Sequence, residues 1–249
     1  MSSRKASDLE YTSKQLAIAI GEYADRVIKK DKSKLGILLC EGRENSIDYT
    51  LYSELYNHLV VIPSNGCSDI ARMVPRVRKY SEYPVFAIID RDNMSRHKMR
   101  SLAERGIFTT RLPFIENIIC CPEVLKIVTP VCGKVYSEAI GEIKSSLTSS
   151  LVEKLLYLNP FDVDIPKEEE IIYVNITIAT KEKIASKRID LNNVLYTFRD
   201  KVIVSEVALV LGLNGREGYY TFIKNQILGE NGQKLLFVMG KYLPKIEVA

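Results

Sequence analysis

One short segment, Tyr83–Asp92 with the sequence YPVFAIIDRD, constrains the fold more than any other part of the chain. Five consecutive apolar residues, Val85–Ile89, follow Pro84 and include three β-branched side chains. An apolar run of this length without polar alternation is typical of a strand that is buried on both faces, as in the middle of a parallel sheet. The segment therefore predicts an α/β protein built on a parallel sheet.

Two acidic residues, Asp90 and Asp92, follow at the end of this predicted strand. If both are still extended, their side chains point the same way, because side chains alternate along a strand. Open α/β sheets bind ligands at the carboxyl ends of their strands. Two carboxylates that face one point repel each other unless a cation lies between them, and their oxygens suit Mg²⁺ or Mn²⁺. The alternative is that Asp92 is only the N-cap of the next helix and that Asp90 is solvated.

Strand patterns alternate with helix patterns through the first half of the chain. The further strands are predicted at Leu35–Cys40, Leu59–Ile62 and Ile107–Thr110. The helices are predicted at Ser13–Lys30 (with Ser13 as N-cap), Ile47–Leu59, Ser68–Tyr80 and Ser95–Arg105, and another begins at Pro122. Strands that alternate with helices are the pattern of a parallel α/β sheet.

The pattern changes after about residue 130, where helices dominate. They are predicted at Tyr136–Leu158, Val202–Gly212, Tyr219–Leu228 and Gly232–Leu243, with one edge strand at Ile171–Ile178. We therefore expect a mostly parallel four-stranded sheet flanked by helices, with a largely helical C-terminal extension. The expected domains are residues 1–130, an α/β catalytic domain with an N-terminal helix, and residues 131–249, a mainly helical region for dimerisation or partner docking.

Composition excludes several classes of protein. The hydrophobic fraction of 46% and charged fraction of 27% are ordinary for a soluble globular protein, and the net charge of +4 permits nucleic-acid binding without requiring it. No segment reaches the length of a membrane span, and the N-terminus has no apolar signal core, so we expect a cytoplasmic protein.

Cysteine and histidine give little support for zinc binding or for nucleophilic catalysis. Five cysteines, an odd number without two CxxC pairs, are expected to be reduced thiols. The chain has only two histidines, His58 and His97, and neither has a recognisable catalytic partner.

Further carboxylates fall where predicted strands end. Glu41 ends the first strand and precedes Gly42, Asp48 lies in the first turn of the next helix, and Glu116 follows the last strand. The carboxyl ends of parallel strands converge, so these residues can share one site with Asp90. Such a site could bind one or two divalent cations, which activate water and stabilise the leaving oxygen of a phosphodiester. The alternative is that Glu41 and Glu116 are ordinary exposed acids and that Asp48 only favours the positive end of its helix.

A turn rich in Ser, Asn and Gly follows the second strand. Its residues Asn65 and Gly66 lie between a predicted strand and a predicted helix. Backbone N–H groups in such a turn can hold a phosphate, although turns of this composition are also frequent for steric reasons alone.

Three motifs in this region resemble the TOPRIM catalytic domain. They are Leu38–Gly42 (LLCEG), Phe86–Asp92 (FAIIDRD) and Ile115–Asn117 (IEN), followed by a Pro-Glu-Val-Leu segment. More closely, they are similar to the OLD-nuclease branch and to AriB-type TOPRIM effectors of the PARIS anti-phage system. The resemblance covers roughly residues 35–125, which is under half of the chain.

The resemblance implies a metal-dependent phosphodiester enzyme. Glu41 matches the first-motif glutamate, which in this family binds metal or acts as a general acid or base. Asp90 and Asp92 match the metal-binding pair. Glu116 matches the later acidic residue of the OLD-like branch, and Asp48 lies where relatives often carry another acid.

The resemblance also implies phosphate-binding residues and partners. OLD nucleases use a basic residue near the scissile phosphate, and the candidates here are Arg43, Arg91, Lys98 and Arg111. The chain contains no GxxxxGK[ST] motif, so an ABC/AAA-type ATPase partner, as in OLD and PARIS systems, would be a separate polypeptide. We also expect a homodimer.

Four functional hypotheses follow. The first is a Mg²⁺-dependent nuclease that acts as a toxic effector in bacterial phage defence and cleaves RNA, with tRNA suggested by the resemblance. The second is a DNA nickase or endonuclease of the OLD type. The third is a catalytically silent TOPRIM-like module that binds a partner. The fourth is a nucleotidyl-binding α/β domain without hydrolysis.

Overall fold

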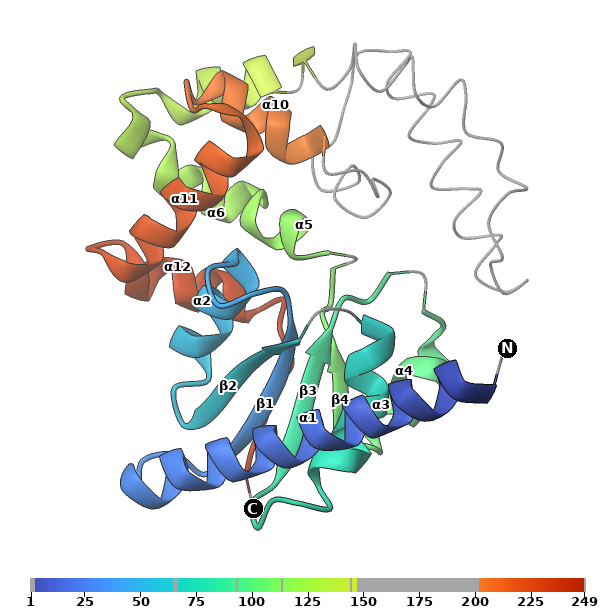
Figure 1. Cartoon of the computed structure of the whole chain (residues 1–249). Helices are drawn as coiled ribbons and strands as arrows, with labels where there is room; N and C mark the ends of the chain where they lie inside the picture. The colour runs from blue at the N-terminus through green and yellow to red at the C-terminus, as the bar shows by residue number, and fades with distance from the viewer. Residues whose placement is uncertain are drawn as a thin grey trace. The chain divides into compact units, whose positions relative to one another are not determined.

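The chain forms two compact units in the computed structural model (Figure 1). The structure describes residues 3–64, 67–92, 94–112, 114–143, 145–146 and 202–248. The first unit comprises Met1–Asp90, His97–Thr110 and Leu243–Ala249, and the second comprises Arg91–Arg96 and Arg111–Tyr242. We call them the sheet unit and the helical unit.

The sheet unit contains a four-stranded sheet in which every pair of neighbouring strands is parallel. Its strands are β1 (Gly36–Glu41), β2 (Leu59–Ser64), β3 (Val85–Ile89) and β4 (Ile107–Thr109), in the order β2-β1-β3-β4. Residues Ile37 to Cys40 of β1 are fully buried, so the central strand is covered on both faces. The predicted α/β class with a four-stranded parallel sheet is confirmed. The prediction succeeds because a continuous apolar run needs to be covered on both faces of the sheet, as helices do here.

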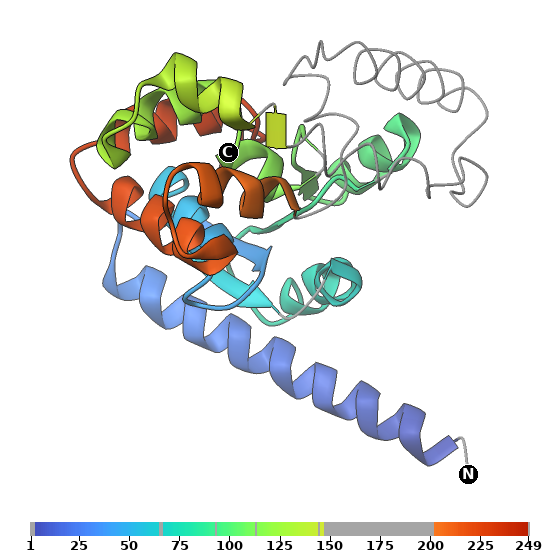
Figure 2. The same cartoon turned by 90° about the horizontal axis from the view of Figure 1, so that it is seen from above.

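Helices cover both faces of this sheet (Figure 2). They are α1 (Ser3–Lys30), α2 (Ile47–Leu55), α3 (Cys67–Val77) and α4 (Arg96–Ala103). The right-handed connections between parallel strands place α2 on one face and α3 and α4 on the other. Helix α1 packs against α3.

The element boundaries differ from the predicted ones mainly at α1. This helix begins at Ser3, so Ser13 is not its N-cap. Instead, Ser13 Oγ accepts a hydrogen bond from the Arg76 guanidinium on α3. Serine is a common N-cap residue, so a serine just before an apolar pattern predicts a helix start. Here Ser13 lies inside a helix that has already begun.

Gly106 connects α4 to β4 in the left-handed region, with φ +74°. A Cβ at this position would lie 2.2 Å from Arg78 Nη2, and the same guanidinium donates to the Val85 carbonyl at 2.8 Å. The glycine therefore leaves room for an arginine that ties the end of α3 to the start of β3.

The helical unit consists of short packed helices. They are α5 (Ile115–Ile119), α6 (Pro122–Val128), the 3₁₀ turn η1 (Pro130–Cys132), α10 (Val202–Val210), α11 (Gly215–Leu228) and α12 (Gly232–Gly240), with residues 136–143 also helical. Tyr219 on α11 is fully buried, and its hydroxyl donates to the Ile119 carbonyl at 2.7 Å. The predicted helical C-terminal region is confirmed. The predicted strand Ile171–Ile178 lies outside the described residues.

The division into units does not follow the predicted boundary at residue 130. Helices α5 and α6 belong to the helical unit because they pack against α10 and α12, which come much later in the sequence. The last segment, Leu243–Ala249, belongs to the sheet unit. There the Tyr56 hydroxyl donates to the Pro244 carbonyl at 2.6 Å, and Ile246 is buried.

Two sequence expectations about the environment of the protein can be compared with the described residues. Among these residues, no helix combines the length and the apolar character needed to cross a membrane. The cysteines with described side chains, Cys40, Cys120, Cys121 and Cys132, are free thiols.

Candidate metal centre at the edge of the sheet

Strand pairing brings Glu41 and Asp90 to the same edge of the sheet. Glu41 is the last residue of β1, and the register pairs its neighbour Cys40 with Ile88 of β3. Asp90 follows Ile89, the last residue of β3. Because β1 and β3 are adjacent and parallel, both carboxylates lie at the carboxyl edge, where α/β proteins bind ligands. Both side chains are half-buried.

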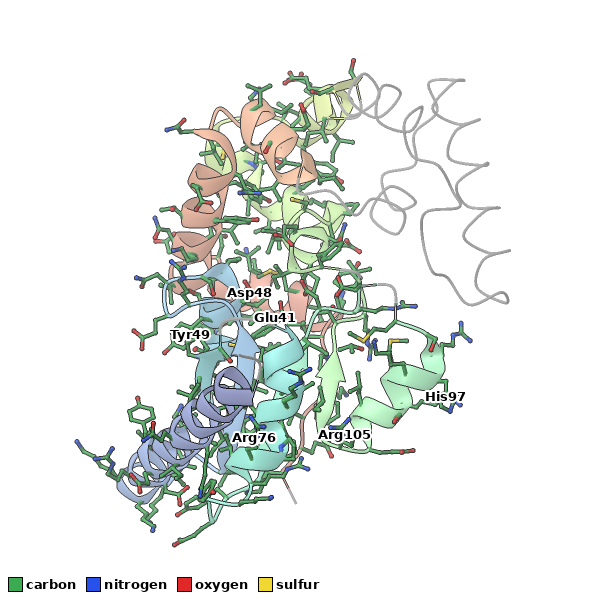
Figure 3. All side chains as sticks on the ribbon, turned by 45° about the vertical axis from the view of Figure 1, so that its right-hand side comes forward. Glu41, Asp48, Tyr49, Arg76, His97 and Arg105 are labelled. Atoms are coloured by element: carbon green, nitrogen blue, oxygen red, sulfur yellow. The ribbon has the colours of Figure 1, made fainter. Side chains whose placement is uncertain are left out.

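A tight turn at Gly42 adds Asp48 to this edge. Gly42 has φ +98°, and a Cβ there would lie 2.4 Å from Ser46 Oγ and 3.7 Å from Asp48 Oδ2. Ser46 is the N-cap of α2, and its Oγ accepts from the Tyr49 N–H at 3.2 Å. The absence of a side chain at Gly42 therefore lets the first turn of α2 fold back onto the end of β1, so that Asp48 approaches the residue next to Glu41 (Figure 3).

The three acids raise the pKa values of two buried side chains. Burial raises the pKa of Tyr52, and the carboxylates of Asp48 and Asp90 raise it further. Burial also raises the pKa of the Cys40 thiol, with Asp48 and Glu41 adding to the effect. Asp48 thus acts on the same buried phenol as Asp90 and on the same buried thiol as Glu41. The three carboxylates belong to one unit, although they come from β1, α2 and the loop after β3.

The fit of this group to a divalent cation is partial. Carboxylate oxygens are the ligands that Mg²⁺ and Mn²⁺ prefer. In the part of the chain that the structure describes, however, no three or more His, Cys, Asp and Glu residues are arranged so that they could hold one ion. The donor chemistry therefore suits the predicted metal, whereas the side chains as placed do not form a coordination shell.

The side chains of Asp90 and Asp92 were expected to point the same way only if both residues were extended, and Asp92 is not. Strand β3 ends at Ile89, and Asp92 lies in a turn with φ +47°, so the two aspartates are not both extended. Asp92 is also not the N-cap of α4, because that helix begins at Arg96. Aspartate is one of the few residue types that tolerate the left-handed conformation. Asp92 is exposed and belongs to the helical unit.

Glu116 lies on a helix and not at a strand end. It is the second residue of α5 in the helical unit, and only 7% of its surface is exposed. Its Oε1 accepts a hydrogen bond from the Tyr220 hydroxyl at 2.9 Å. Burial raises the pKa of Tyr220, and the Glu116 carboxylate raises it further, so the tyrosine stays a donor. No sequence pattern points to Tyr220 as the partner of Glu116, because the two residues are 104 positions apart in the chain.

The predicted phosphate-binding residues are spread over several segments. Arg43 is exposed in the loop after β1, and Lys98 is exposed on α4. Arg91 and Arg111 belong to the helical unit, where Arg91 Nη1 donates to the Arg111 carbonyl at 3.3 Å. Asn65 and Gly66 lie outside the described residues, so the predicted phosphate turn has no structural description.

No family model, no curated protein and no solved structure matches this chain.

Proposed function

We propose that this protein is a metal-dependent nuclease of the TOPRIM type that hydrolyses RNA, with tRNA as the suggested substrate, and acts as a toxic effector in bacterial anti-phage defence. The observation that supports the proposal most is the placement of Glu41 and Asp90 at the ends of adjacent parallel strands, with Asp48 on the first turn of α2, which approaches Gly42. These acids lie at the carboxyl edge of a parallel sheet, the ligand-binding edge of such folds.

Each residue has a defined part in this proposal. Glu41, Asp48 and Asp90 would hold Mg²⁺ or Mn²⁺. A bound ion would supply charge stabilisation and an activated water for phosphodiester cleavage. Tyr52 keeps its proton because burial and the nearby carboxylates raise its pKa, so it adds no negative charge to the acidic edge. A separate ATPase polypeptide and a homodimer belong to the same proposal.

The test is a cleavage assay with the full chain. Purified protein is incubated with tRNA and, in parallel, with supercoiled plasmid, in Mn²⁺ or Mg²⁺. We expect tRNA cleavage by the wild type and none by Glu41→Gln or Asp90→Asn, with thermal unfolding showing that both variants are folded. Cleavage of plasmid alone would favour the OLD-type DNA nickase, and undiminished tRNA cleavage by both variants would refute the assigned site.

One observation favours a second function, that of a catalytically silent module which binds a partner protein. Among the described residues, no three or more His, Cys, Asp and Glu side chains are arranged to hold one metal ion, as a silent relative of a metalloenzyme would show. Titration calorimetry with Mn²⁺ separates the two functions. Heat of binding that disappears in Asp90→Asn supports the nuclease, whereas no binding by the wild type supports the silent module.

A further inference from the structure

One aromatic side chain of the helical unit, Phe237 on α12, lies in solvent. It is 72% exposed, the largest exposed fraction among the large hydrophobic residues that the structure describes. Helix α12 buries Leu235 and Met239, and the helical period places Phe237 on the opposite face. The packing of the helical unit therefore does not account for this ring.

Two lysines lie on the same face of α12. Lys234 precedes Phe237 by three residues and Lys241 follows it by four, which are the spacings of neighbours on a helix surface. Both lysines are exposed, and Lys241 Nζ lies over the Phe237 ring, 4.8 Å from its centroid. Residues 231–242 contain no acidic residue. We call Lys234, Phe237 and Lys241 the α12 stripe, an aromatic ring between two cations.

Helix stability accounts for only one of these lysines. Lys241 is at the C-terminal end of α12, where the helix dipole favours a cation, and its ammonium group also contacts the ring. Lys234 is in the first turn after the N-cap Asn231, where the helix dipole disfavours a positive charge. The charge of Lys234 therefore has a cost for the helix and no benefit to it.

The alternation of cation and aromatic ring matches a single-stranded nucleic acid. Bases stack on exposed aromatic side chains, and lysines bind the phosphates. Lys241 lies over one face of the Phe237 ring, which leaves the other face for a base. The two lysines are seven residues apart, about 10 Å along the helix axis, so they lie on either side of the stacked base.

A protein partner fits the stripe less well. The neighbours of Phe237 on the helix surface are Gln233, Lys234, Gly240 and Lys241, and none of them has a large apolar side chain. The core of a protein interface is apolar and depleted of lysine, so an isolated ring between lysines lacks the contiguous apolar surface that such a core requires.

We propose that the α12 stripe binds a single-stranded RNA, with one base stacked on Phe237 and neighbouring phosphates paired with Lys234 and Lys241. The inference rests on the proposed function for its choice of RNA. The stacking and the phosphate contacts are argued from the stripe alone. The stripe gives the helical unit a part in holding the substrate.

The first test measures RNA binding by the full chain without cleavage. A short fluorescent single-stranded RNA is titrated by anisotropy in EDTA. The test variant is Phe237→Ala, and the matched control is Leu209→Ala on α10, which is 70% exposed and has no Lys or Arg within four residues. Phe237→Ala should weaken binding about 5- to 150-fold, the usual loss for one stacked base, whereas the control should bind as the wild type does.

Circular dichroism melts verify that both variants are folded. Wild-type affinity in Phe237→Ala, an equal loss in Leu209→Ala, or no binding of RNA by the wild type would overturn the inference.

The second test detects stacking directly. The chain contains no tryptophan, so Phe237→Trp introduces a single fluorescent reporter. Single-stranded RNA should bind this variant and quench its fluorescence, because the indole replaces the phenyl ring as the stacking surface. Duplex RNA and polyglutamate should quench it far less, since neither offers an unpaired base. Equal quenching by duplex RNA would refute stacking of an unpaired base, and equal quenching by polyglutamate would favour an acidic protein partner.

The third test concerns the lysines. Lys234→Gln/Lys241→Gln should lower the slope of log K against log salt by about 1.4, because each phosphate contact contributes about 0.7 on a single strand. The control, Lys14→Gln/Lys30→Gln, removes the same charge from exposed positions on α1. An unchanged slope, or an equal change in the control, would contradict the phosphate contacts. Tighter binding of single-stranded DNA than of RNA would overturn the choice of RNA.

The same proteins are assayed for RNA cleavage with Mn²⁺ added. If the wild type does not cut RNA but its binding depends on Phe237, the nuclease proposal fails and the inference about the α12 stripe stands. If the wild type cuts RNA and Phe237→Ala binds it with unchanged affinity, only the inference fails.

Discussion

The sheet unit and the helical unit treat their acidic residues differently. In the sheet unit, Glu41, Asp48 and Asp90 remain partly exposed at an edge where parallel strands end together. In the helical unit, Glu116 is buried and accepts a hydrogen bond from Tyr220. Acidic side chains thus remain accessible at the edge of the sheet, whereas in the helical unit Glu116 is buried beside a hydrogen-bond donor. An acidic residue after an apolar run is therefore a functional candidate only where strand pairing brings a second acid beside it.

The largest expected effect is on RNA cleavage, which should depend on the acids at the sheet edge. Glu41→Gln and Asp90→Asn should each lower RNA cleavage by about 100- to 1,000-fold, which is the usual loss when a group that stabilises developing charge is removed. The rate is measured with Mn²⁺ at saturating substrate. Glu44→Gln, an exposed acid in the loop after β1, is the control and should retain activity. A comparable loss of RNA cleavage in Glu44→Gln would show that the acids at the sheet edge have no special role in the reaction.

The backbone of the sheet edge should be less tolerant than that of the helical unit. Gly42→Ala places a Cβ against Ser46 at φ +98° and should cost about 1–3 kcal/mol of unfolding free energy. Gly141→Ala is the matched control, because nothing lies within 4 Å of its added Cβ. It should be neutral or stabilising by about 0.5–1 kcal/mol. Denaturant titration measures both, and a Gly42→Ala protein as stable as the wild type would contradict the tight turn.

The hydrogen bond from Tyr220 to the buried Glu116 can be tested in the helical unit. Tyr220→Phe takes away the donor to Glu116 and should cost about 1–2 kcal/mol, because a buried carboxylate loses a hydrogen bond. Tyr242→Phe removes a similar hydroxyl from the exposed Glu123 at 3.1 Å and should cost under about 0.5 kcal/mol. Equal effects in chemical denaturation would show that burial of Glu116 carries no penalty.

Alkaline pH should weaken both units by a smaller amount. Burial raises the pKa of Tyr52 in the sheet unit and of Tyr219 in the helical unit. The folded state therefore favours the protonated phenols, so their contribution is fully present below about pH 10, the ordinary tyrosine pKa, and is lost as pH rises above it.

Melting temperatures measured from about pH 8 to about pH 11 test this dependence. Tyr52→Phe and Tyr219→Phe should each decline less steeply than the wild type. Tyr23→Phe, at a site that is 53% exposed, should follow the wild type. A wild-type decline that neither buried substitution flattens would assign the alkaline sensitivity to other groups.

Much of the sheet unit was predictable from local patterns. The run Val85–Ile89 is a strand with the predicted bounds, and Leu59 and Ile107 begin strands as expected. Continuous apolar runs and alternating helices specify a buried parallel sheet because the burial requirement acts on each segment separately. The placement of Glu41 and Asp90 at one edge of the sheet follows from the rule that parallel strands end together.

The placement of Asp92 and Glu116 was not predictable in this way. The conformation of Asp92 depends on where β3 stops, and a change of one residue in that end alters the direction of the side chain. The burial of Glu116 depends on Tyr220, which folding brings to it from 104 residues away.

The sequence by itself determined which segments are strands, which are helices and which acids follow the strands, because these depend on interactions among near neighbours in the chain. The tertiary structure decided the strand order, the return of Leu243–Ala249 to the sheet unit and the partners of each carboxylate. These depend on contacts between distant segments, and such contacts form only when apolar faces from different parts of the chain are buried together.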